Sequence, residues 1–241
     1  MRPDGRRPTD LRPIRIVRGY TEQAPGSVLI EAGRTRVFVT ATVEERQPPH
    51  LLNTVQGWVT AEYSMLPGST PERKQREASR GRLEGRTQEI ARLIGRAVRA
   101  AVDLNALGPR TIWIDADVLQ ADGGTRTLSI TGAYVALVDA VRSLHRQGKL
   151  DALPKLTPVA AVSVGVVEGK VLLDLNYAED AAAEVDMNVV MVQGGRLIEV
   201  QGTAEHRPFD EATLLQMLRV ARSGIRKLMV MQKKALSGKP A

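Results

Sequence analysis

A short glycine turn, Ala121-Asp122-Gly123-Gly124-Thr125-Arg126, has residue types that could hold an anion. It follows a strand-like run and precedes a strongly helical one, so its backbone N–H groups would lie at a helix N-terminus, where negative charge is favoured. The hydroxyl of Thr125 and the forked guanidinium of Arg126 suit phosphate oxygens. A glycine pair before a helix is also an ordinary tight turn, and the segment taken alone favours that simpler interpretation.

A second group of candidates lies in a basic segment. Residues 73–99 contain eight arginines and one lysine against three glutamates. Arg86 falls beside the apolar stripe of a predicted helix, where its charge needs an anion or a carboxylate, and Glu84 or Glu89 could supply the carboxylate. A polar loop over residues 67–77 precedes this helix. Three arginines lie in or beside the loop, where they could follow an RNA backbone or only keep the loop solvated: Arg73, Arg76 and Arg80.

A third group consists of carboxylates near a predicted hairpin: Asp174, Glu179, Asp180 and Asp186. Crowded carboxylates repel one another, so they need a divalent cation, a shared proton or a basic partner. They could bind Mg²⁺ or act in general acid catalysis, but Asp and Glu are also common at hairpin ends, and the pattern alone slightly favours a turn. The three histidines are isolated and the chain has no cysteine, so neither type supports a metal site.

The elements that must position these residues alternate in blocks of strands and helices. We expect helices over residues 79–102, 127–146 and 211–234, the last capped by Asp210. We expect strands over eight ranges, the last four of them beyond a break at Pro154 and Pro158: 27–31, 36–43, 55–63, 111–119, 159–167, 170–175, 185–192 and 196–202. Such blocks predict an α+β architecture with mixed sheets covered by helices.

Composition limits the class of protein. The 43% hydrophobic and 25% charged residues are typical of a globular chain, and the 3% aromatic content argues against a surface that binds nucleic acid by base stacking. The net charge of +7 suggests a polyanionic partner. The charged N-terminus has no apolar stretch after it, and the longest apolar run, residues 156–167, is too short for a bilayer. We therefore expect a soluble, cytoplasmic protein without a membrane segment.

Seven sequence segments, spread over nearly the whole chain, together resemble ribonuclease PH, a family of phosphate-dependent 3′→5′ exoribonucleases. They are RPDGR at 2–6, LRPI at 11–14, GWVTAEYSMLP at 57–67, EGRTQEI at 84–90, DGGTRT at 122–127, DMNVV at 186–190 and EVQGTAE at 199–205. The resemblance implies a single domain over 1–241, with a fold like the second domain of ribosomal protein S5. Within it, a core over 10–150 would contain the phosphate site, and 158–236 the carboxylate cluster.

The resemblance also implies roles for the candidate residues. Inorganic phosphate, the co-substrate, would be held by Arg86 together with Gly124, Thr125 and Arg126. Asp180 and Asp186 would serve catalysis and bind Mg²⁺. The loop arginines would contact RNA in a homohexameric ring built as a trimer of dimers, in which they could serve a neighbouring site.

Members of this family remove nucleotides from the 3′ end of tRNA precursors and release nucleoside diphosphates, and they run in reverse as nucleotidyltransferases; tRNA and rRNA maturation are the processes implied. One alternative is a non-catalytic RNA-binding ring subunit, against which the retained arginines and aspartates argue. The other is a hydrolytic nuclease, which would need no cradle for free phosphate.

Overall fold

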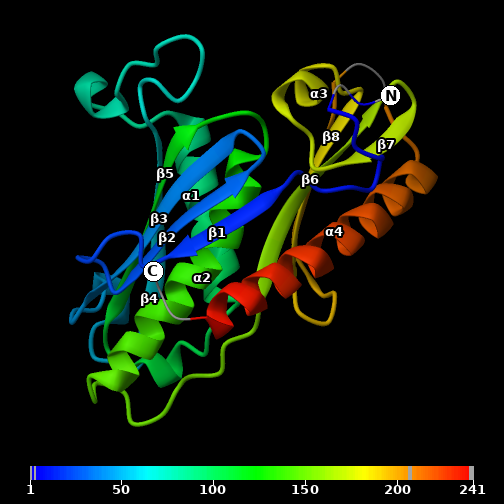
Figure 1. The fold of residues 1–241 in the computed structure, drawn as a ribbon. Coiled ribbons are helices and arrows are strands. Elements are labelled where there is room, and N and C mark those ends of the chain that lie inside the picture. Colours follow the sequence, from blue (N-terminus) through cyan, green and yellow to red (C-terminus); the bar gives the residue numbers. More distant parts are fainter. Residues whose placement is uncertain (1, 3, 206–207, 239–241) are drawn as a thin grey trace.

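The computed structural model describes residues 2, 4–205 and 208–238, apart from the side chains of Ala78 and Arg80. Two sheets and the helices that cover them form the molecule (Figure 1). This arrangement confirms the α+β architecture predicted from the sequence. No helix among the described residues is long and apolar enough to cross a membrane.

The first sheet has five strands and contains one parallel pair. β4 and β5 are parallel, whereas the other neighbouring strands are antiparallel. A parallel pair requires a crossover connection, and this one includes α1 (Gly85–Arg99), which packs against β4. In spatial order the strands are β1 (Ile14–Arg18), β2 (Gly26–Ala32), β3 (Thr35–Glu44), β5 (Thr111–Gln120) and β4 (Trp58–Met65).

The second sheet is antiparallel throughout. A short helix, α3 (Tyr177–Ala181), connects its strands β7 and β8, and α4 (Glu211–Ser237) packs along the sheet (Figure 1). Asp210 caps α4 as predicted, because its carboxylate accepts from the backbone N–H of Thr213 at 2.8 Å. In spatial order the strands are β7 (Lys170–Leu173), β6 (Val159–Val167), β8 (Val185–Val192) and β9 (Leu197–Ala204).

Helix α2 (Thr125–Arg146) joins the two sheets. It packs against β2 and β3 of the first sheet and against β6 of the second. Residues 127–141 are buried on every side of this helix, as expected for a helix without a solvent-facing stripe. The N-terminus of α2 is therefore fixed between the two sheets, and this is the end that carries the glycine turn.

The buried faces agree with the sequence patterns. The apolar stripe predicted for the first helix is buried along its whole length, as is the predicted inner face of β5. These residues are Ile90, Leu93, Ile94, Ala97 and Ala101 in the former and Ile112, Ile114, Ala116 and Val118 in the latter.

One predicted helix begins later than the sequence pattern indicated. Residues 79–84 were expected to be helical, but the chain forms a 3₁₀ turn over Glu77–Arg80 and α1 starts only at Gly85. The backbone explains the difference, because Gly81 has a φ of +68° and Glu84 is extended. Arg86 consequently lies in the first turn of α1, where its side chain is exposed, rather than within a longer helix.

One strand, β1, and one α-helix, α3, were not predicted. β1 escapes the alternation pattern because arginines occupy two of its five positions, and one of them, Arg18, is buried in an ion pair with Asp139. α3 is too short to show helical periodicity. A capping box formed by Asn176 and Glu179 opens it, and that pair was the only local signal for the helix.

Candidate active site

The glycine turn opens α2 with a left-handed backbone. Gly123 and Gly124 have φ values of +78° and +67°, and Gly124 is the N-cap residue, with no side-chain cap. A non-glycine residue would be strained at either position. The N-terminus of α2 therefore has no side-chain cap, and its first backbone N–H groups are of the kind that can bind an anion.

Gly123 also lets the turn approach the chain that leads to α3. A Cβ atom at Gly123 would lie 2.6 Å from the carbonyl oxygen of Leu175. Two residues after Leu175, the backbone N–H of Tyr177 donates to the carboxylate of Asp122 at 3.4 Å. The carboxylate of Asp122 therefore contacts the start of α3.

Arg12 holds these two segments together. Its buried guanidinium pairs with Asp174 at 2.7 Å and donates to the carbonyl oxygen of Asp122 at 2.6 Å. Asp174 itself has a φ of +55°, a conformation that costs energy unless the surroundings hold it. This bond network fixes the glycine turn of one half of the fold against the aspartate-bearing segment of the other.

A second N-terminal arginine fixes α3. Arg2 pairs with Glu179 through two hydrogen bonds of 2.7 Å, and both side chains are almost fully buried. The arginine also holds the pKa of Glu179 below its usual range, against the opposing effect of burial. Asp174 and Glu179 are therefore paired with arginines, which is the basic-partner alternative that the sequence left open for the carboxylate group.

Asp180 and Asp186 remain as the carboxylates of the site. Asp180 lies on α3 and Asp186 at the start of β8. Partial enclosure by protein is the largest cause that raises the pKa of Asp186, followed by the negative charges of Asp180 and Glu205. Enclosure also raises the pKa of Asp180, while Arg86 and Arg126 act in the opposite direction. The two aspartates and the two arginines thus share one electrostatic environment.

Arg126 is held by polar groups from two other elements. Its guanidinium donates to Gln201 of β9 at 2.6 Å and to Glu89 of α1 at 3.3 Å. Gln201 also donates to Glu89 at 3.3 Å, which closes a three-residue network. Because its side chain is only 13% exposed, Arg126 keeps a fixed position beside the N-terminus of α2.

Thr125 has a partner that sequence analysis missed. Its hydroxyl forms a hydrogen bond of 2.9 Å with the hydroxyl of Tyr63 on β4, and both residues are buried. Burial raises the pKa of Tyr63, although Arg86 and Arg126 partly offset it. Tyr63 therefore belongs to the same site and orients the Thr125 hydroxyl. The signal for it was the segment GWVTAEYSMLP, which the sequence offered without a role for its tyrosine.

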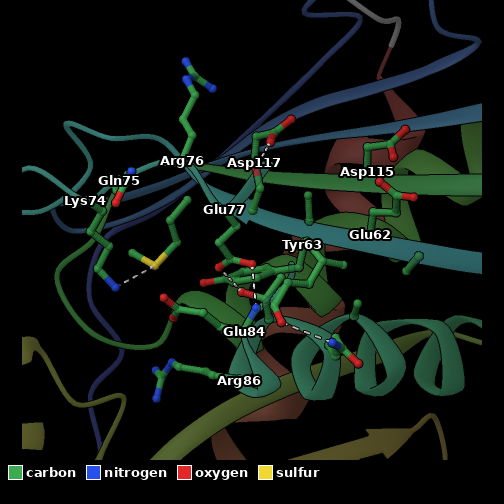
Figure 2. Close-up of a pocket in the computed structure, with 18 of the residues that line it drawn as sticks. Glu62, Tyr63, Lys74, Gln75, Arg76, Glu77, Glu84, Arg86, Asp115 and Asp117 are labelled. Carbon is green, nitrogen blue, oxygen red and sulfur yellow. Dashed lines mark hydrogen bonds between the residues drawn. The ribbon is translucent and has the colours of Figure 1, made fainter. Parts of the chain in front are cut away.

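Glu77 ties the polar loop to the start of α1. Its carboxylate accepts from the hydroxyl of Thr87 at 2.6 Å and from the backbone N–H of Glu84 at 3.0 Å. Neither Glu84 nor Glu89 forms an ion pair with Arg86 within the described part of the chain. The guanidinium of Arg86 extends away from Glu77 (Figure 2) and remains available for an anion.

A cleft of about 870 Å³ adjoins this site along β4, α1 and the polar loop (Figure 2). Its lining combines cations, among them Arg73, Arg76 and Arg86, with carboxylates. The carboxylates on the sheet lie at neighbouring positions of β4 and β5, where Glu62 pairs with Asp115. Burial and the negative charges of Glu62 and Asp117 raise the pKa of Asp115. The side chain of Arg80 lies outside the described residues.

The chain matches two models that describe one family. Residues 10–143 match domain 1 of the 3′ exoribonuclease family, and residues 157–224 match domain 2. The chain belongs to the 3′ exoribonuclease family. Ribonuclease PH of Corynebacterium kroppenstedtii is 56% identical over 237 residues, which cover 98% of this chain and 93% of the relative.

Solved structures of this 3′ exoribonuclease fold agree with the architecture. A chain of the Archaeoglobus fulgidus exosome, solved with RNA bound to the active site, superimposes with a TM-score of 0.82 at 23% identity and covers 95% of this chain and 92% of its own length. Rice (Oryza sativa) Rrp46 gives a TM-score of 0.78 at 20% identity, with 98% of this chain and 100% of that chain covered. At these identities the likeness concerns the fold.

The family relationship fixes the class of reaction. The chain is a phosphorolytic 3′ exoribonuclease of the ribonuclease PH type, which uses inorganic phosphate. The candidate site combines an uncapped helix N-terminus and two arginines with two carboxylates whose pKa is raised.

Proposed function

We propose that this site trims the 3′ end of tRNA precursors, with phosphate bound by Arg86, Gly124, Thr125 and Arg126 and with Asp180 and Asp186 as catalytic residues. The observation that carries the proposal is the shared electrostatic environment of Asp180, Arg86 and Arg126. It means that a phosphate bound by the two arginines would lie beside the aspartates. Maturation of rRNA 3′ ends would follow the same chemistry.

The reaction joins a phosphate oxygen to the phosphorus of the last phosphodiester. The bond from that phosphorus to the 3′ oxygen of the preceding nucleotide breaks, and a nucleoside diphosphate leaves. Free phosphate and RNA repel each other, so two fixed guanidinium groups and helix N–H groups lower the barrier by positioning and by offsetting charge. In the reverse direction the same groups hold the diphosphate for nucleotide addition.

The leaving 3′ oxygen needs a proton. An aspartate with an ordinary pKa would be almost fully ionised at neutral pH, but burial and like charge raise the pKa of both Asp180 and Asp186. Two neighbouring carboxylates also favour the sharing of one proton. A raised pKa favours the protonated form that a general acid needs, so we propose that one aspartate of the pair supplies this proton.

The same pair suits Mg²⁺, which we propose as the metal. Mg²⁺ is usually held by one or two carboxylates together with substrate phosphates and water, rather than by a complete cage of protein ligands. No group of three or more acidic or histidine side chains able to hold a metal occurs among the described residues, so Asp180 and Asp186 fit this mode. When bound, Mg²⁺ would offset phosphate charge.

The polar loop is proposed to guide RNA. Arg73 and Arg76 are exposed and line the cleft, and Arg80 belongs to the same loop. We expect the variant Arg73→Ala/Arg76→Ala to raise the KM for RNA several-fold and to leave the KM for phosphate unchanged, because phosphate-backbone contacts are lost away from the reacting atoms. Steady-state kinetics with each substrate varied in turn would test this. A rise in the KM for phosphate alone would contradict the assignment.

We also propose that residues 1–241 act as one domain within a homohexameric trimer of dimers, in which loop arginines serve a neighbouring site. The packing of α2 against both sheets supports the single domain. A ring offers the RNA a shared surface, and light scattering of the purified protein would test the hexamer. We also propose a cytoplasmic location, where tRNA precursors and phosphate would be available.

One product analysis tests the function as a whole. A tRNA precursor labelled in its 3′ nucleotides is incubated with Mg²⁺, with and without phosphate. We expect nucleoside diphosphates that depend on phosphate. Monophosphates without phosphate would indicate a hydrolytic nuclease. RNA binding without any product would indicate a non-catalytic ring subunit.

A further inference from the structure

A second large groove lies at the other end of the second sheet. It has a volume of about 860 Å³ and is formed by the last part of α4, α2 and the turn between β8 and β9. Asp186 is the second residue of β8, whereas Gln193 of the groove follows its end. That separation is roughly 23 Å along the strand. The groove is therefore distinct from the candidate active site, with which its lining shares no residue.

The charge of this groove has one sign. Its cations are Arg142, Arg222, Arg226 and Lys233, and no Asp or Glu lines it among the described residues. Arg222, Arg226 and Lys233 are exposed. Arg142 is half-buried and donates to the carbonyl oxygen of Leu236 at 2.9 Å, which leaves its charge without a carboxylate partner in the described part of the chain.

The spacing of the cations on α4 makes them a continuous surface. Arg219, Arg222, Arg226 and Lys233 follow one another at intervals that return to the same helix face. The row is about 21 Å long at the rise of an α-helix. By contrast, Lys227 lies on a different face and donates to the carbonyl oxygen of Thr9.

We infer that this groove binds the sugar–phosphate backbone of the RNA substrate at a distance from the 3′ end that reacts. The inference rests on the proposed function, because it concerns the same RNA. A second copy of the chain would bring its own net charge of +7 to an already basic surface, whereas a polyanion is complementary to it. Arginine favours bidentate contacts with phosphate.

The expected effect is a difference between long and short substrates. A tRNA precursor can reach the groove while its 3′ end is in the active site, but a short single strand with the same 3′ sequence cannot. We expect Arg222→Gln/Arg226→Gln to raise the KM for the tRNA precursor several-fold and to leave the kinetics of the short strand unchanged. The dependence of log affinity on log salt should lose a slope of about 2, one unit for each phosphate contact.

The matched control is Arg34→Gln/Lys170→Gln, which removes the same charge from exposed positions outside the groove, one in a turn and one at the start of β7. Fluorescence anisotropy with the intact protein measures tRNA binding even if no turnover occurs, so failure of the proposed activity is distinguishable from failure of this inference. Equal effects of the two double variants would overturn the inference. So would a parallel loss with the short strand, or a change of oligomeric state with unchanged tRNA affinity, which would assign the groove to a second copy.

Discussion

Arg126→Ala is expected to lower kcat/KM for phosphate by about 10²- to 10³-fold, which is the usual cost of removing one fixed donor from a developing anion. Arg126 lies beside the N-terminus of α2 and is held by Gln201 and Glu89. Its loss removes both charge and geometry from the phosphate site. RNA affinity should fall much less, because the polar loop and the other arginines remain.

Rapid-quench measurements of a single turnover, with phosphate varied, would separate this effect from RNA binding. Arg15→Ala is a suitable control, because Arg15 also pairs with a glutamate, Glu31, but is exposed on the first sheet. Arg126→Lys should give an intermediate rate, since lysine retains the charge and loses the fork. A selective loss of RNA affinity in Arg126→Ala, with phosphate use intact, would refute the assignment.

The sequence predicted the fold wherever one face of an element is buried. The apolar stripe at Ile90, Leu93 and Ile94 and the alternation in β5 both result from contact with a core. The hydrophobic periodicity of the sequence therefore predicted these two elements correctly. β1 and the true start of α1 were missed for the opposite reason. Their positions depend on an ion pair from a distant helix and on the backbone of Gly81, neither of which leaves a periodic signal.

The site was predictable in its residue types and only in part in its geometry. Gly124, Thr125 and Arg126 are local to one turn, so their joint placement at the start of α2 follows from the chain itself. The split of the carboxylates depends on contacts between residues more than 160 positions apart. Only the fold shows that Arg12 and Arg2 take Asp174 and Glu179, and that Tyr63 reaches Thr125.

Asp186 differs from the carboxylates that pair with buried arginines, and this difference leads to a prediction in which activity and stability change in opposite directions. Asp186→Asn should lower kcat by about 10²-fold or more, in line with the loss of an acid–base group. It should also raise the Tm at neutral pH. The reason is that burial, Asp180 and Glu205 make the ionised form of Asp186 less favourable in the folded protein than in the unfolded chain. An asparagine removes that penalty along with the chemistry.

The sign of the effect sets its pH dependence. Because the pKa of Asp186 is raised in the folded state, the penalty is complete above that pKa, decreases as the pH falls through it, and is absent below the ordinary pKa of an aspartate. The Tm difference between Asp186→Asn and the wild-type protein should therefore be largest near neutral pH and close on acidification. Differential scanning calorimetry across this range would measure it.

Two other aspartates provide controls for this test. Asp151→Asn alters an exposed turn and should change neither the Tm nor kcat. Asp174→Asn should lower the Tm, because it leaves the buried Arg12 without its carboxylate. If Asp186→Asn lowered the Tm as Asp174→Asn does, Asp186 would be a structural partner of a cation. Its assignment to the reacting centre would then be wrong, since a carboxylate that serves the fold gains stability from its charge and one that serves proton transfer in this crowded site loses it.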